Sequence, residues 1–276
     1  MLRHGWPADH AAVWQSRETA GEGGAPGWSL SDGAVALARN MAGVDTVLCL
    51  AGVTPGPTSG PTSGSVADFA LNARLAEAVV AAAAVAGGVR RVFLASSAAV
   101  YGAAPGPLTE SGLCVPVSDY GRAKLEMEQR AAEVAQARGV ALCCLRIGNV
   151  VGADMLFGNV AAGRAITLDR FADGTTPRRS YIDPLRLGRV VRGLTDLARA
   201  GADLPPVLNV ASEPALAMAD LLEAAHVGYG TRPAPATAQP LVALDIARLG
   251  MLLPFMAGPC DAAAAVAAWR SVGGPQ

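Results

Sequence analysis

Short apolar runs along the chain alternate with longer segments whose apolar residues recur every three or four positions. The short runs, at residues 45–52, 90–97, 140–147 and 208–211, predict strands that are buried on both faces. The longer segments, at residues 66–86 and from Ser118 to about Arg138, predict helices between them. Ser118 is a suitable N-cap and Gly139 a suitable C′ residue. This alternation predicts an α/β fold with a doubly wound, parallel, Rossmann-type sheet.

Composition narrows the class of protein. The chain has 276 residues, 51% of them hydrophobic, and a formal net charge of -1. A mean hydropathy of +0.33 excludes a disordered chain, and the charge balance argues against nucleic-acid and anionic-membrane partners. The longest uncharged apolar stretch, residues 78–89, is too short to span a bilayer, and we expect no signal peptide.

Cysteine and histidine usage points to a reducing compartment and to no metal. The five cysteines show no CxxC spacing, and an odd number suits a cytoplasmic protein. The three histidines do not cluster, so we expect no metal site.

Only one of the 22 basic residues is a lysine, Lys124, and it follows Tyr120 by four positions. This spacing places both side chains on one face of a helix, one turn apart. A nearby ammonium stabilises a phenolate, so we expect the pKa of Tyr120 to lie below its usual value near ~10. The spacing alone is a weak signal, because a solvated pair on an exposed helix would look the same.

A second element, Ser96 and Ser97, ends the strand predicted at residues 90–97. Ligands of open α/β sheets bind at the carboxyl ends of the strands. A serine hydroxyl there can hold a substrate oxygen beside Tyr120. The alternative is that both serines only satisfy backbone groups at a strand end.

Taken together, these elements resemble the extended short-chain dehydrogenase/reductases, in particular their NAD-dependent epimerase/dehydratase branch. The resemblance covers roughly residues 40–215 and rests on motifs that occur in family order. These motifs are the strand before Gly52, the helix with Asn72, SSAAVYG from Ser96, YGRAK from Tyr120, LRIGNVVG from Leu145, RSYID from Arg179 and LNVAS from Leu208.

The resemblance implies a role for each matched residue. Ser97, Tyr120 and Lys124 would be catalytic, with Tyr120 as general acid/base, Lys124 on the nicotinamide ribose and Ser97 on the substrate oxygen. The cofactor, NAD or NADP, would contact Ala51, Gly52, Asn72, Tyr120 and Lys124. Substrate would contact Ser97, Asn149 and Arg179. The chemistry implied is epimerisation or dehydration of a small molecule such as a nucleotide sugar, or net reduction of a carbonyl.

The resemblance also implies a division of the chain. Residues 1–150 would form the dinucleotide-binding domain, to which residues 180–212 return. Residues 151–179 and 213–276 would form a small substrate lobe. The helices at residues 66–86 and 118–138 occupy the positions through which family members form homodimers.

The beginning of the chain departs from the family pattern, which opens with a strand, a glycine-rich loop and a helix. Gly21, Gly24 and Gly27 have the right spacing, but the residues before them are too polar for a central strand. We therefore interpret them as a coincidence and expect the first βα unit to lie upstream of Met1. On this alignment residues 11–15 are the second strand and residues 28–32 the third strand with its turn. Arg17 then follows the second strand, where an arginine can accept the 2′-phosphate of NADP. A solvated Arg17 is the alternative.

Two functions other than catalysis remain open at this stage. The first is a non-catalytic dinucleotide sensor or scaffold on the same fold. The second is an inactive, truncated remnant, which the missing glycine loop alone suggests.

Overall fold

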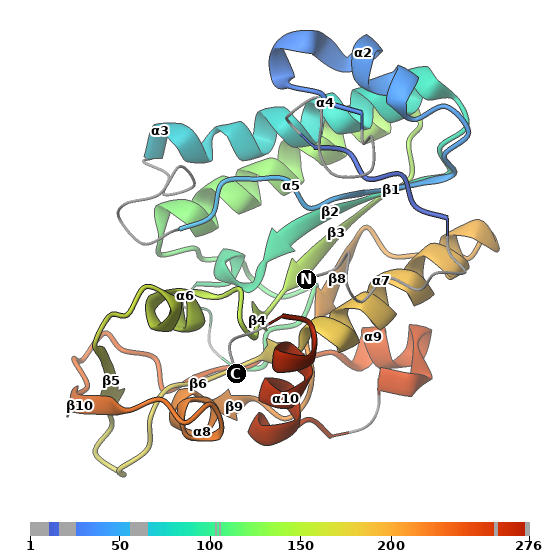
Figure 1. Ribbon diagram of the computed structural model, residues 1–276. Helices are drawn as coiled ribbons and strands as arrows, with labels where there is room; N and C mark the ends of the chain where they lie inside the picture. The colour runs from blue at the N-terminus through green and yellow to red at the C-terminus, as the bar shows by residue number, and fades with distance from the viewer. Residues whose placement is uncertain are drawn as a thin grey trace.

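Four parallel strands form the central sheet of the computed structural model, which describes residues 11–16, 26–55, 66–102, 104, 106–256 and 259–273. The strands are β1 (Thr46–Cys49), β2 (Arg91–Ser97), β3 (Leu142–Ile147) and β8 (Val207–Val210), in the order β1-β2-β3-β8 (Figure 1). The first three lie inside predicted apolar runs, and β8 begins one residue before its predicted run. The predicted parallel α/β architecture is confirmed.

Helices cover both faces of this sheet (Figure 1). One face carries α2 (Gly33–Asn40), α4 (Leu71–Ala86) and α5 (Asp119–Arg138), and the other carries α7 (Pro184–Arg199). The helix predicted at residues 66–86 is divided into α3 (Val66–Phe69) and α4. The α5 helix begins and ends as predicted, because the Ser118 hydroxyl caps its first turn and Gly139 adopts a left-handed φ of 65°.

The side chains of the inner strands alternate between two hydrophobic cores. Val92 and Leu94 of β2 pack with α2, α4 and α5, whereas Phe93 between them packs with α7. This period of two follows from the pleat of a strand. It explains why β2 and β3 read as continuous apolar runs, since both of their faces are covered.

The strands predicted at residues 11–15 and 28–32 do not form. A single parallel bridge joins Ser16 to Gly27, with the Trp28 N–H donating to the Ser16 carbonyl at 3.0 Å. The chain then turns at once into a short 3-10 helix, η1 (Leu30–Asp32), because the Asp32 carboxylate accepts a hydrogen bond from the Ser29 N–H at 2.7 Å. Of the other glycine-motif positions, Gly21 and Gly24 lie outside the described residues. Arg17 also lies outside them.

Smaller elements build a lobe at the carboxyl edge of the sheet (Figure 1). They include α6 (Met155–Ala161), α8 (Met218–Ala224), α10 (Ala262–Ser271) and the parallel pair of β5 (Ile166–Arg170) with β10 (Tyr229–Pro233). Two further small sheets are β4 (Asn149–Val150) with β7 (Tyr181–Ile182), and β6 (Arg178–Arg179) between β9 (Leu216–Ala217) and β11 (Leu241–Val242). The remaining elements are η2 (Ala98–Val100), α9 (Ala247–Leu252) and η3 (Pro254–Met256).

The lobe has its own core, in which the rings of Phe157 and Trp269 lie 4.6 Å apart. Within the range 213–276, however, Leu249 and Leu253 pack into the core under α7. The division into a dinucleotide-binding domain and a substrate lobe therefore remains a proposal. In the described part of the chain, no helix is both long and apolar enough to cross a membrane.

Candidate functional site

The carboxyl end of β2 meets the first turns of α5, and this junction holds the predicted catalytic residues. Ser97 ends β2, and its hydroxyl accepts a hydrogen bond from the Ala99 N–H at 3.2 Å. The Ser118 hydroxyl accepts from the Gly121 N–H at 3.0 Å and so starts α5 beside the same point. Ser97 therefore satisfies a backbone group at the end of the strand, as the alternative interpretation of this serine expects. It also faces α5.

Gly121 allows α5 to approach η2 closely. A Cβ atom at this position would lie 2.4 Å from the Ala99 carbonyl oxygen, well inside van der Waals contact. The neighbouring Tyr120 is therefore brought to Ser97. Burial raises the pKa of the Tyr120 phenol, and a hydrogen bond with Ser97 acts in the opposite direction. The Tyr120 ring also lies edge-on to Phe69, with 5.7 Å between the ring centroids.

Lys124 is buried one turn further along α5, with 3% of its surface exposed. Its Nζ donates to the Ala95 carbonyl at 2.7 Å and lies 5.9 Å from the centroid of the Tyr120 ring. Burial lowers the pKa of Lys124. Our expectation of a lowered pKa for Tyr120 is wrong for this structure, because the phenolate loses more solvation on burial than its neighbours return.

Two further predicted residues, Gly52 in the turn after β1 and Asn72 of α4, lie beside Lys124. Asn72 of α4 holds both backbone groups of Val53: its Oδ1 accepts from the Val53 N–H at 2.8 Å, and its Nδ2 donates to the Val53 carbonyl at 3.0 Å. A Cβ at Gly52 would lie 2.5 Å from Asn72 Oδ1 and 3.4 Å from Lys124 Nζ. Ala51 is exposed on the same turn. The turn after β1 is therefore clamped beside the lysine.

Asn149 and Arg179 belong to the two short sheets beyond the junction. Asn149 Nδ2 donates to Asp154 Oδ2 at 3.3 Å, and the Tyr181 hydroxyl donates to the same oxygen at 3.1 Å. Burial raises the pKa of the Asp154 carboxyl. No pattern in the sequence indicated Asp154, which also caps α6. Its contacts fix the orientation of the Asn149 amide.

Arg179 is half-buried in β6. Its Nη1 donates to the carbonyls of Arg178, at 2.8 Å, and of Gln239, at 3.1 Å. Burial lowers the pKa of the Arg179 guanidinium. Within the described residues no carboxylate forms a salt bridge with it, so its charge is available to an anion. No hydrogen bond or salt bridge in the same part of the chain joins Arg179 or Asn149 to Tyr120 or Lys124.

Sequence reasoning missed a buried polar network directly behind the junction. Arg146 of β3 donates from Nη2 to Glu128 Oε2 of α5 at 2.7 Å and from Nε to Glu128 Oε1 at 3.0 Å. The Ser96 hydroxyl donates to the same carboxylate, and the Arg146 guanidinium lies 4.8 Å from the centroid of the Tyr101 ring. Glu128 follows Lys124 by four positions, so the helical spacing alone could have indicated it.

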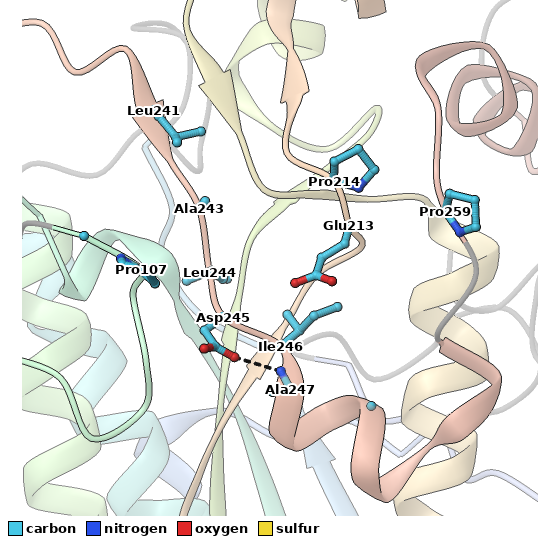
Figure 2. Close-up of a pocket in the computed structure, with 12 residues that line it drawn as sticks. Pro107, Glu213, Pro214, Leu241, Ala243, Leu244, Asp245, Ile246, Ala247 and Pro259 are labelled. Carbon is cyan, nitrogen blue, oxygen red and sulfur yellow. Dashed lines mark hydrogen bonds between the residues drawn. The ribbon is translucent and has the colours of Figure 1, made fainter.

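A separate cavity of about 1010 Å³ lies between the loop at Gly106 and the segment that leads into α9. Figure 2 shows it bordered mainly by apolar side chains, with the Glu213 carboxylate pointing toward residues 245–247. None of the predicted catalytic, cofactor or substrate residues lines this cavity. The carboxyl edge of the sheet therefore remains the candidate site.

Comparison with known proteins gives a family, a curated relative and a set of similar folds. The sequence model of the NAD dependent epimerase/dehydratase family matches residues 26–178. The dTDP-6-deoxy-L-talose 4-dehydrogenase (NAD(P)(+)) of Kitasatospora kifunensis is 35% identical over 166 residues, which are 57% of this chain and 51% of that protein. The match thus spans about half the length of this relative.

Among solved structures, the UDP-N-acetylglucosamine 4-epimerase of Bacillus cereus has a TM-score of 0.68 at 18% identity, covering 94% of this chain and 89% of that one. MoeE5 in complex with UDP-glucose and NAD has a TM-score of 0.66 at 24% identity, covering 93% and 89%. At these identities the two structures show a shared fold.

Proposed function

Because the chain belongs to the NAD dependent epimerase/dehydratase family, we propose that it acts on a nucleotide sugar by NAD-dependent hydride chemistry, with Ser97, Tyr120 and Lys124 as catalytic residues. The family membership confirms the resemblance inferred from the sequence. The observation that carries the proposal is the convergence of β1, β2, α4 and α5 on one buried lysine.

The residues at this edge fit the nicotinamide half of NAD. At Gly52 the Asn72 Oδ1 atom fills the space that a Cβ would need, and this close packing places the turn after β1 beside Lys124. The Lys124 ammonium has three donors, of which one binds the Ala95 carbonyl and one contacts the Met127 sulfur, so a third is left for a ligand. Bound NAD supplies a carbon that accepts and returns a hydride. The glycine loop for its pyrophosphate is not among the described residues, and Arg17, which bears on the choice between NAD and NADP, lies outside them.

The chain's own groups supply acid/base chemistry. Since burial raises the pKa of Tyr120, its phenol oxygen carries a proton at neutral pH and donates it to a developing alkoxide. The Ser97 hydroxyl, beside Tyr120, holds the substrate oxygen in line with that proton. Lys124 stabilises the phenolate that is left behind.

A nucleotide-sugar substrate fits the charge of the lobe. Arg179 has no carboxylate partner in the described region, and a diphosphate is the anion best matched to a half-buried guanidinium. The names of the relatives agree with this substrate class: the talose dehydrogenase acts on a dTDP-sugar, and MoeE5 was solved with UDP-glucose.

We further propose a homodimer through α4 and α5. A groove of about 540 Å³ between these helices is lined partly by Ala78, Ala81 and Val134, whose small side chains permit close helix packing. Light scattering should give a mass near twice the 27.9 kDa of the chain. A monomer at micromolar concentration contradicts this part of the proposal.

The substitution Lys124→Arg tests the catalytic assignment. It keeps the charge, but the planar guanidinium cannot occupy the buried position at Ala95, so we expect a folded protein whose turnover falls at least ~100-fold. Turnover should be measured on a panel of nucleotide sugars with both NAD and NADP, and cofactor binding by NADH fluorescence.

The control is Arg122→Lys, the reverse exchange at an α5 side chain that is 55% exposed, which should leave turnover unchanged. Undiminished turnover by Lys124→Arg contradicts the assignment. A parent chain that binds NADH but turns over nothing supports the sensor or scaffold alternative, and a folded chain without binding supports the remnant.

A further inference from the structure

Tyr120, Lys124 and Glu128 follow one another at four-residue spacing along the face of α5 that meets β2. Three consecutive β2 residues receive them: Ser97 bonds Tyr120, the Ala95 carbonyl accepts from Lys124, and Ser96 donates to Glu128. The helix is therefore fixed to the strand from Tyr120 to Glu128. Of the three helix residues in these contacts, Glu128 is the negatively charged one.

Glu128 is held as firmly as any side chain at this junction. Its carboxylate is 6% exposed, as is the Arg146 side chain that binds it through two nitrogens. A buried carboxylate with a fork-shaped guanidinium partner has a fixed position and a fixed charge. Removing only one member of such a pair leaves an uncompensated buried charge.

The charged and titratable groups that face Lys124 come from several elements. Cys49 of β1 and Cys144 of β3 contribute thiols, and burial raises the pKa of each, so both are neutral near pH 7. Tyr120 is neutral for the same reason. Among the described groups around the ammonium, Glu128 is the one carboxylate whose charge favours the protonated amine. The Arg146 guanidinium bound to it carries a positive charge that acts in the opposite direction.

We propose that Glu128 is a positioning residue, which keeps the Lys124 amine protonated and fixed at the carboxyl end of β2. Burial by itself lowers the pKa of Lys124, so without a nearby anion the amine would more readily lose its proton. Arg146 and Ser96 hold the anion in place. The importance of this arrangement for catalysis rests on the proposed function, but the charge of Lys124 does not.

The single lysine makes a direct test available. Growth on lysine labelled with ¹³C at Cε gives one side-chain resonance in the NMR spectrum, that of Lys124, and its shift reports the protonation of the amine. Glu128→Gln keeps the shape and removes the charge. We expect the midpoint of the titration to fall by about one pH unit. Glu128→Asp keeps the charge on a shorter side chain and should restore most of the difference.

The matched control is Glu126→Gln, the same change two residues earlier on α5, at a side chain that is 54% exposed and bound to Arg130. It should leave the midpoint unchanged. A folded Glu128→Gln protein with the parent midpoint overturns the proposal.

If Glu128→Gln does not fold, the double variant Glu128→Gln/Arg146→Met is titrated instead, because it also removes the guanidinium that is left without a partner. A midpoint below that of the parent supports the proposal, and a midpoint equal to or above it overturns the proposal. The titration uses neither cofactor nor substrate, so its outcome is independent of whether the chain is an enzyme.

Discussion

Two effects of opposite sign act on the stability of the substitution Gly121→Ala, which are helix propensity and the close contact of Gly121 with Ala99. Helix propensity favours alanine by at most about 1 kcal/mol. The new Cβ, however, would lie 2.4 Å from the Ala99 carbonyl oxygen and 3.1 Å from Pro116 Cβ. To restore normal contact, α5 must retreat by roughly 1 Å, and overpacking of this kind costs about 1–3 kcal/mol. We therefore expect a net loss of about 1–2 kcal/mol in the free energy of unfolding.

Urea unfolding with linear extrapolation measures this difference directly. The control is Gly158→Ala in α6, where a Cβ meets no atom within 4 Å, so that only the gain in helix propensity remains. The two substitutions should change stability in opposite directions. Because Tyr120 moves with Gly121, turnover should fall by about 10-fold or more. If Gly121→Ala is as stabilising as Gly158→Ala, the close packing of α5 on η2 is wrong.

Two further predictions follow from buried titratable groups. Burial raises the pKa of Asp154 in the folded state above its unfolded value near ~3.9, so the fold loses stability as pH rises through the folded pKa. Asp154→Asn keeps a cap for α6 and removes this loss, so its stability relative to the parent should increase from about pH 4 towards pH 7 in urea titrations. A pH-independent difference contradicts this. Burial also raises the pKa of Cys143 to about 12 and that of Cys144 further, so a thiol reagent at pH 8 should modify both only when urea unfolds the chain. Labelling of either thiol in the native protein would show that β3 is more accessible to solvent than the burial of Cys143 and Cys144 indicates.

Local pattern was sufficient wherever neighbours in sequence decide the outcome. The capping of α5 by Ser118 and Gly139 depends on backbone groups within one helical turn, and the four parallel strands depend on apolar runs that both faces of the sheet bury. The spacing of Tyr120 and Lys124 on one helix face likewise needs only 3.6 residues per turn. The sequence therefore determined the fold class and the candidate catalytic helix.

An alignment misled the prediction at residues 11–15 and 28–32: neither range forms a strand, and the local contact of Asp32 with Ser29 begins η1 in the second range. Contacts between distant segments decided the rest. The sign of the pKa shift of Tyr120 depends on how much solvent α3 and η2 exclude, and no spacing of residues encodes that quantity. The Glu128–Arg146 pair joins α5 to β3 across 18 positions. Desolvation and long-range pairing are properties of the packed chain, so only the tertiary structure fixes the charge environment of the single lysine.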